Sequence, residues 1–129
     1  MLVLLDTSVL IDALRLRHRR RELLAELARS GHRLSTTALN VAEVYAGMRP
    51  EEEQQTQAFL AALECYDITP TAGRLAGNLK NKWARKGQTL ALADTLVAAV
   101  AIERRCTLMT DNLTDFPMPE LSHFQLPNE

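Results

Sequence analysis

Residues 2–10 read LVLLDTSVL, an apolar run that ends on an aspartate and two hydroxyl residues. Leu2–Leu5 has the length and unbroken apolar character of a parallel strand buried on both faces. Asp6–Ser8 offers the side chains that begin helices, so we expect a helix over Val9–Leu16. A buried strand that leads directly into a helix is typical of proteins in which helices cover a parallel sheet.

The rest of the chain continues this alternation. Further helices are expected at Arg20–Ser30, Ala38–Ala46 with Thr37 as its cap, Pro50–Glu64, Thr71–Lys86 and Leu90–Arg105 with Thr89 as its cap. Further strands are expected at His32–Thr36, Tyr66–Thr69, Thr107–Thr110 and Phe124–Leu126. The pattern predicts an α/β sandwich with a short, mainly parallel sheet, formed by residues 1–129 as a single domain.

Composition narrows the class of protein. The formal net charge of -1 argues against a protein that coats DNA, yet it leaves room for a nucleic-acid enzyme with an uneven charge distribution. Cys65 and Cys106 lie far apart beside apolar residues, which predicts reduced core thiols. No signal peptide and no apolar stretch long enough to span a membrane is visible, so a cytoplasmic location is expected.

Two aspartates occupy positions suited to chemistry. Asp6 follows the first buried strand, and ligands of open α/β sheets bind at the carboxyl ends of strands. Asp94 interrupts an apolar helix, where a carboxylate is costly unless it is paired or binds a metal. The structural alternatives are a helix cap for Asp6 and stabilisation by the helix N-terminus for Asp94.

Further acids come from the middle and the end of the chain. Glu43 lies among apolar residues of its helix, although a solvated glutamate is the more ordinary interpretation of this residue taken alone. The stretch Asp111–Asp115 follows a strand, although aspartates there also suit a turn. Several carboxylates in one pocket repel each other, and a divalent cation relieves that repulsion. Magnesium and manganese prefer such oxygen ligands, whereas the cysteines and histidines are too scattered for zinc.

Four motifs resemble those of the PIN-domain ribonucleases, and in particular the VapC-type toxins of toxin–antitoxin pairs. The motifs are LDTSVLID at residues 5–12, the segment Thr37–Gly47 around Glu43, LADTLVAA at residues 92–99, and LMTDNLTDF at residues 108–116. Together the four motifs span nearly the whole chain, from residue 5 to residue 116. The resemblance implies a three-layer α/β/α sandwich and a Mg2+- or Mn2+-dependent endoribonuclease in which metal-activated water attacks the RNA phosphate.

The resemblance also implies roles for individual residues. Asp6 and Asp94 would be metal ligands, and Glu43 and Asp115 would complete the catalytic cluster. Asp111 is unusual beside its threonine, so the choice between Asp111 and Asp115 as fourth acid stays open at this point. The supporting polar residues would be Thr7, Ser8, Thr110 and Asn112, with Asp111 among them if Asp115 is the fourth acid.

The sequence also offers candidate residues for RNA contact, and the resemblance implies several partners. Arg17 and Arg20 belong to one basic cluster and Lys82, Trp83 and Arg85 to a second, and both are candidates for RNA contact or are simply solvated helix faces. The resemblance implies an RNA substrate, a cognate small antitoxin and a homodimer, with no membrane partner. It also implies that apolar residues such as Leu14, Leu23 and Leu27 are exposed in the free monomer.

Other families of proteins also place a functional aspartate directly after an early strand. A phosphatase of the haloacid-dehalogenase type needs a second aspartate where Ser8 stands, and a receiver domain needs an acidic pair and a late lysine that are missing. Two closer alternatives are a PIN-fold RNA-processing nuclease without an antitoxin and a non-catalytic binding module of the same fold.

Overall fold

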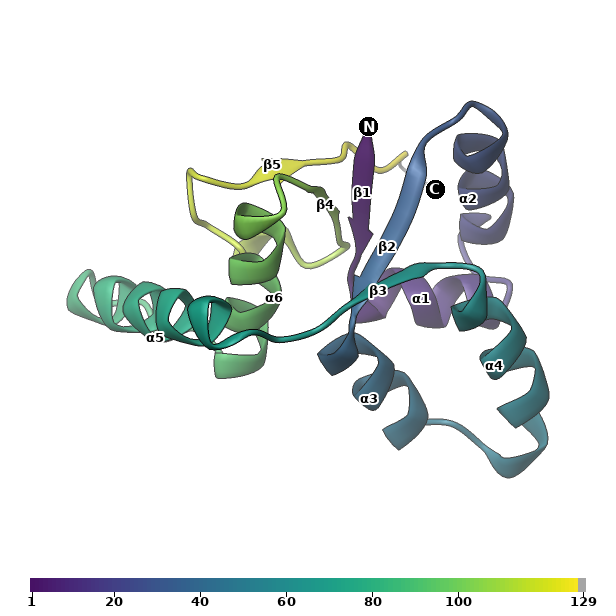
Figure 1. Cartoon of the computed structure of the whole chain (residues 1–129), viewed down its shortest axis with the longest axis horizontal. Helices are drawn as coiled ribbons and strands as arrows, with labels where there is room; N and C mark the ends of the chain where they lie inside the picture. The colour runs from purple at the N-terminus through teal and green to yellow at the C-terminus, as the bar shows by residue number, and fades with distance from the viewer. Residues whose placement is uncertain (128–129) are drawn as a thin grey trace.

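A five-stranded parallel sheet forms the centre of the computed structural model, which describes residues 1–127 (Figure 1). The strand order β3-β2-β1-β4-β5 places the first strand in the middle. The strands are β1 (Leu2–Leu5), β2 (Arg33–Thr37), β3 (Glu64–Tyr66), β4 (Thr107–Met109) and β5 (Ser122–His123). The predicted α/β class with a short parallel sheet is confirmed.

Helices connect the strands and cover the sheet. The α-helices are α1 (Thr7–Leu14), α2 (Arg20–Arg29), α3 (Ala38–Ala46), α4 (Glu53–Ala61), α5 (Pro70–Arg85) and α6 (Leu92–Glu103). Two 3-10 turns, η1 (Pro50–Glu52) and η2 (Leu113–Asp115), precede α4 and follow β4. In Figure 1, α5 and α6 lie on one side of β1 and β2, and α1 and α2 lie on the other.

The alternation of side chains along β1 divides the core between the two faces of the sheet. Leu4 packs with apolar residues of α5 and α6, whereas Val3 and Leu5 pack with residues of α1 and α2. All three are fully buried. Successive strand residues point to opposite faces, so a strand covered by helices on both sides must be apolar throughout. This is the three-layer arrangement that the sequence predicts.

Several predicted boundaries are wrong for local reasons. The expected strand Tyr66–Thr69 is replaced by β3 because Thr69 leaves the sheet to cap α5, accepting a hydrogen bond from the Ala72 amide at 3.1 Å. The last strand lies earlier than Phe124–Leu126. Pro50–Glu64 is not one helix, since it contains η1, α4 and the start of β3.

The start of α6 also differs from the prediction. Ala91, and not Thr89, is the N-cap residue. Lys80 of α5 donates a hydrogen bond to the carbonyl of Leu90, which holds the preceding residues outside the helix. The later start leaves Asp94 in the first turn of α6.

The two cysteines have different environments. Cys106 is buried and Cys65 is exposed, and both are free. Cys65 lies on the edge strand β3 and is exposed, so its predicted core position is wrong. No helix among residues 1–127 is long and apolar enough to cross a membrane.

Candidate active site

Asp6 lies where the chain order of the strands reverses. From β1 the chain passes to β2 and β3 on one side and later to β4 and β5 on the other, and ligands of such sheets bind at this switch point. Asp6 follows β1 directly and is 6% exposed. It occupies the N-cap position of α1, yet its side chain makes no capping hydrogen bond. The carboxylate is therefore available for other contacts.

Two side chains hold the Asp6 carboxylate in place. The hydroxyl of Thr110 donates to Oδ2 over 2.8 Å, and the amide of Asn40 donates to Oδ1 over 3.3 Å. Burial raises the pKa of Asp6, and the Thr110 hydrogen bond opposes that effect. Both oxygen atoms thus have a donor from a neighbouring element.

Asn40 is a site residue that sequence reasoning missed. It is fully buried, and its amide also donates to the Thr7 hydroxyl over 2.9 Å. Its carbonyl oxygen accepts the hydroxyl of Thr37 at 2.7 Å, and its backbone N–H donates to that hydroxyl at 3.2 Å, as in a capping box. The signal for it was the spacing Thr37-x-x-Asn40, which fixes a polar side chain at the third helical position beside Asp6.

Glu43 lies on α3 one helical turn beyond Asn40 and is exposed. The Thr7 hydroxyl donates to its Oε1 atom over 2.6 Å. Because Thr7 also accepts from Asn40, one hydroxyl links the glutamate to the network around Asp6. Glu43 is therefore directed toward the end of β1 and is more than a solvated helix residue.

Asp94 has the most perturbed carboxyl group of the site. Burial and then the charges of Asp115, Asp6 and Glu43 raise its pKa from 3.8 to about 6. Among residues 1–127 its side chain has no hydrogen-bond or ion-pair partner to offset them. The fold thus brings Asp6 at the end of β1, Glu43 of α3 and Asp115 of η2 within electrostatic reach of Asp94 on α6.

The two aspartates of the loop after β4 have separate neighbours. Asp115 ends η2, is exposed and acts electrostatically on Asp94. Asp111 forms an ion pair with Arg20 at 3.0 Å. Its backbone N–H also contacts the Ser8 hydroxyl at 3.4 Å, and the N–H of Asn112 donates to the Thr110 hydroxyl at 3.0 Å.

The donor set fits a hard divalent cation by its chemistry. Its members are carboxylates supported by hydroxyl and amide groups, the oxygen-rich environment that Mg2+ and Mn2+ prefer. Within the described residues, no three histidine, cysteine or acidic side chains lie close enough together to form a metal-binding group. Glu43 and Asp115 are exposed.

The basic residues proposed for RNA contact fall into two groups. Arg17, Lys82 and Arg85 are exposed. Trp83 is half-buried, and the Lys86 ammonium covers its ring at 4.5 Å, so the ring is not an open stacking surface. Arg20 is 4% exposed, and its predicted place on a solvated RNA-binding face is wrong because it pairs with Asp111 inside the fold.

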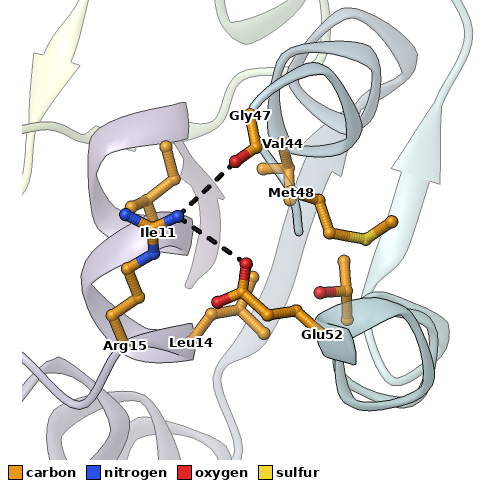
Figure 2. Close-up of a pocket in the computed structure, with 8 residues that line it drawn as sticks. Ile11, Leu14, Arg15, Val44, Gly47, Met48 and Glu52 are labelled. Atoms are coloured by element: carbon orange, nitrogen blue, oxygen red, sulfur yellow. Dashed lines mark hydrogen bonds and ion pairs between the residues drawn. The ribbon is translucent and has the colours of Figure 1, made fainter. Parts of the chain in front are cut away.

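A separate groove lies between α1, α3 and η1 (Figure 2). Arg15 crosses it, with Nη2 3.5 Å from the Gly47 carbonyl and 3.7 Å from Glu52. Below this bridge the wall is apolar and includes Leu14 and Val44. None of the four acids lines the groove. Leu14, Leu23 and Leu27, expected to be exposed, are half-buried because they pack on the core of this side.

Comparison with known proteins gives one consistent match. The family model described as PIN domain matches residues 3–116. The chain is 33% identical to Ribonuclease VapC19 and 31% identical to Ribonuclease VapC10 of Mycobacterium tuberculosis, over 92% of this chain and 95% and 89% of theirs. Its structure resembles VapBC2 from Rickettsia felis, solved with a promoter DNA fragment, with a TM-score of 0.84 and 25% identity over 98% of this chain and 100% of that one.

Proposed function

Because the chain belongs to the PIN domain family, we propose that it is an endoribonuclease that requires Mg2+ or Mn2+ and acts as the toxin of a toxin–antitoxin pair. The observation that carries the proposal is Asp94, an unpaired carboxyl group whose pKa is raised by burial and by three other acids. Such a cluster is unfavourable unless a cation neutralises it. The relatives named ribonucleases supply the substrate class.

In the proposed mechanism each acid has a place. Asp6 and Asp94 would hold the cation, and Glu43 and Asp115 would complete its surroundings. Thr110 and Asn40 fix both oxygens of Asp6, and Thr7 orients Glu43. A bound Mg2+ or Mn2+ supplies Lewis-acid chemistry and lowers the pKa of water. One of the exposed acids, Glu43 or Asp115, accepts the proton of the attacking water.

The partners form the second part of the proposal. The similarity to VapBC2 supports a cognate small antitoxin. A homodimer stays a prediction, which light scattering of the purified chain would test. Co-purification with the product of the adjoining small reading frame, and loss of cleavage in that complex, would support the toxin assignment.

A substrate comparison tests the activity. The purified chain is incubated with RNA, single-stranded DNA and a phosphomonoester, each with Mg2+, Mn2+ or a chelator. RNA cleavage that requires the cation is expected, and Asp94→Asn abolishes it. The matched control is Glu103→Gln, at the opposite end of α6, which keeps wild-type cleavage.

The other outcomes are equally informative. Hydrolysis of the phosphomonoester alone would overturn the nuclease assignment. A folded chain that neither binds Mn2+ nor cleaves any substrate would be a binding module. Cleavage of RNA by a chain that no small neighbouring protein inhibits would favour an RNA-processing nuclease.

A further inference from the structure

An ion pair between a buried arginine and a partly exposed aspartate joins the start of α2 to the loop that follows β4. The Nη2 atom of Arg20 lies 3.0 Å from Oδ1 of Asp111, and the two side chains are 5% and 33% exposed. A buried arginine is costly to desolvate, and replacement of such pairs by apolar residues is often neutral or stabilising. Stability alone is therefore a weak reason for this pair at this position.

The same guanidinium is tied to the turn between α1 and α2. Its Nη1 atom donates to the carbonyl oxygen of His18 over 3.2 Å. Leu16, His18 and Arg19 in this turn have φ values of 56°, 54° and 56°, a region that residues other than glycine rarely adopt. Strained backbone persists only where surrounding contacts hold it. Arg20 is thus a fixed anchor inside the fold.

Asp111 lies between this anchor and the acid cluster. Thr110, directly before it, donates to Oδ2 of Asp6 over 2.8 Å. The backbone N–H of Asn112, directly after it, donates to the Thr110 hydroxyl over 3.0 Å. A shift of Asp111 would therefore move the hydroxyl that orients Asp6.

We infer that Arg20 and Asp111 are positioning residues whose ion pair holds the Thr110–Asn112 segment, so that Thr110 keeps the Asp6 carboxylate aligned for a divalent cation. The inference rests on the proposed function, because it requires that Asp6 bind the cation. Partners in contact with metal ligands orient them and strengthen metal binding. The two loop aspartates then have different roles. Asp115 belongs to the acid cluster, whereas Asp111 holds the segment whose Thr110 hydroxyl orients Asp6.

Direct titration with Mn2+ alone tests this role without relying on activity. In Asp111→Asn, calorimetry should show Mn2+ affinity weakened on the order of tenfold, the usual loss when such a supporting partner is removed. The double variant Arg20→Met with Asp111→Leu removes both charges, leaves none unpaired, and should show the same loss. RNA cleavage should lose kcat with little change in KM, because the pair acts on the Asp6 carboxylate through Thr110.

The matched control is Glu64→Gln, which breaks the exposed ion pair between Arg33 and Glu64 at the amino ends of β2 and β3. It should leave Mn2+ affinity and cleavage at wild-type values. Wild-type Mn2+ affinity in a folded Asp111→Asn or double variant would overturn the positioning role while leaving the proposed function intact. Complete loss of binding in Asp111→Asn, equal to that in Asp94→Asn, would make Asp111 a ligand and also overturn it.

Two further results keep the test decisive. If Asp111→Asn unfolds, the double variant decides, since it carries no unpaired buried charge. If the wild-type chain binds no Mn2+ at all, the proposed function itself fails, and the positioning role fails with it.

Discussion

The side-chain amide of Asn40, in α3, donates a hydrogen bond to Oδ1 of Asp6, at the end of β1, over 3.3 Å. The Oδ1 atom of the same amide group accepts a hydrogen bond from the Thr37 hydroxyl at 2.7 Å. One buried residue therefore caps a helix and orients an acid of the site. The helix that carries Glu43 and the strand that presents Asp6 are linked through it.

Replacement of Asn40 should weaken both the cap of α3 and the alignment of the Asp6 carboxylate. Asn40→Ala leaves the Thr37 cap and the Asp6 carboxylate without their partner, so we expect a loss of about 1–3 kcal/mol in the free energy of unfolding. Chemical denaturation measures it. Asn40→Asp is the sharper comparison, because it keeps the acceptor for Thr37 and replaces the donor to Asp6 by a like charge. It should weaken Asp6 alignment, and unchanged cleavage in this variant would contradict the role given to Asn40.

Asp94→Asn separates catalysis from folding. The variant removes one charge from a repulsive cluster, so the metal-free protein should be as stable as the wild type or more stable at neutral pH. Cleavage of an RNA oligonucleotide should fall by more than about 100-fold, because even the loss of a supporting partner costs about 10–100-fold. A marked fall in the melting temperature would instead assign Asp94 a structural role at the start of α6.

The stability of the metal-free protein should depend on pH through Asp94. The folded chain keeps the Asp94 proton up to about pH 6, whereas the unfolded chain loses it near the ordinary pKa of 3.8. The folded state therefore binds more protons in this window, and the contribution of Asp94 to stability falls as the pH rises from about 4 to about 6. The free energy of unfolding of wild type minus that of Asp94→Asn should decrease over this range. A flat difference would contradict the raised pKa.

Addition of Mn2+ should restore the stability that the metal-free protein loses as the pH rises. A cation that binds only the folded chain stabilises it by about 2.7 kcal/mol at 100 times its dissociation constant. Thermal unfolding with Mn2+, and again with excess chelator, measures the effect. Asp94→Asn should lack the response, and an equal rise in both proteins would place the cation elsewhere.

Asp115→Asn distinguishes the two loop aspartates. Asp115 is exposed, so its replacement should change the free energy of unfolding by no more than about 0.5 kcal/mol. Cleavage should nevertheless fall, because a member of the acid cluster is lost. Full activity in Asp115→Asn would exclude Asp115 as the fourth acid.

Asp111→Asn should lower the free energy of unfolding by about 1–3 kcal/mol, because Arg20 loses a charged hydrogen-bond partner.

Local chemistry made much of the fold predictable. The apolar run of β1 requires burial on both faces, and Thr37 begins α3 where its capping side chain predicts. Boundaries that depend on contacts between elements were not predictable in this way. Lys80 lies on α5, and its bond to the Leu90 carbonyl delays the start of α6 for a reason that the residues near Thr89 do not contain.

The sequence by itself determined that acids follow β1 and β4 and interrupt α6, because strand and helix patterns are local properties of the chain. Only the tertiary structure decided how these acids are partnered. The sequence left the choice between Asp111 and Asp115 open, and the fold separates them by placing Arg20, at the start of α2, beside Asp111. Asp94 has a raised pKa because the fold buries its carboxyl group and then brings the charges of Asp115, Asp6 and Glu43 near it, and both effects depend on position in space.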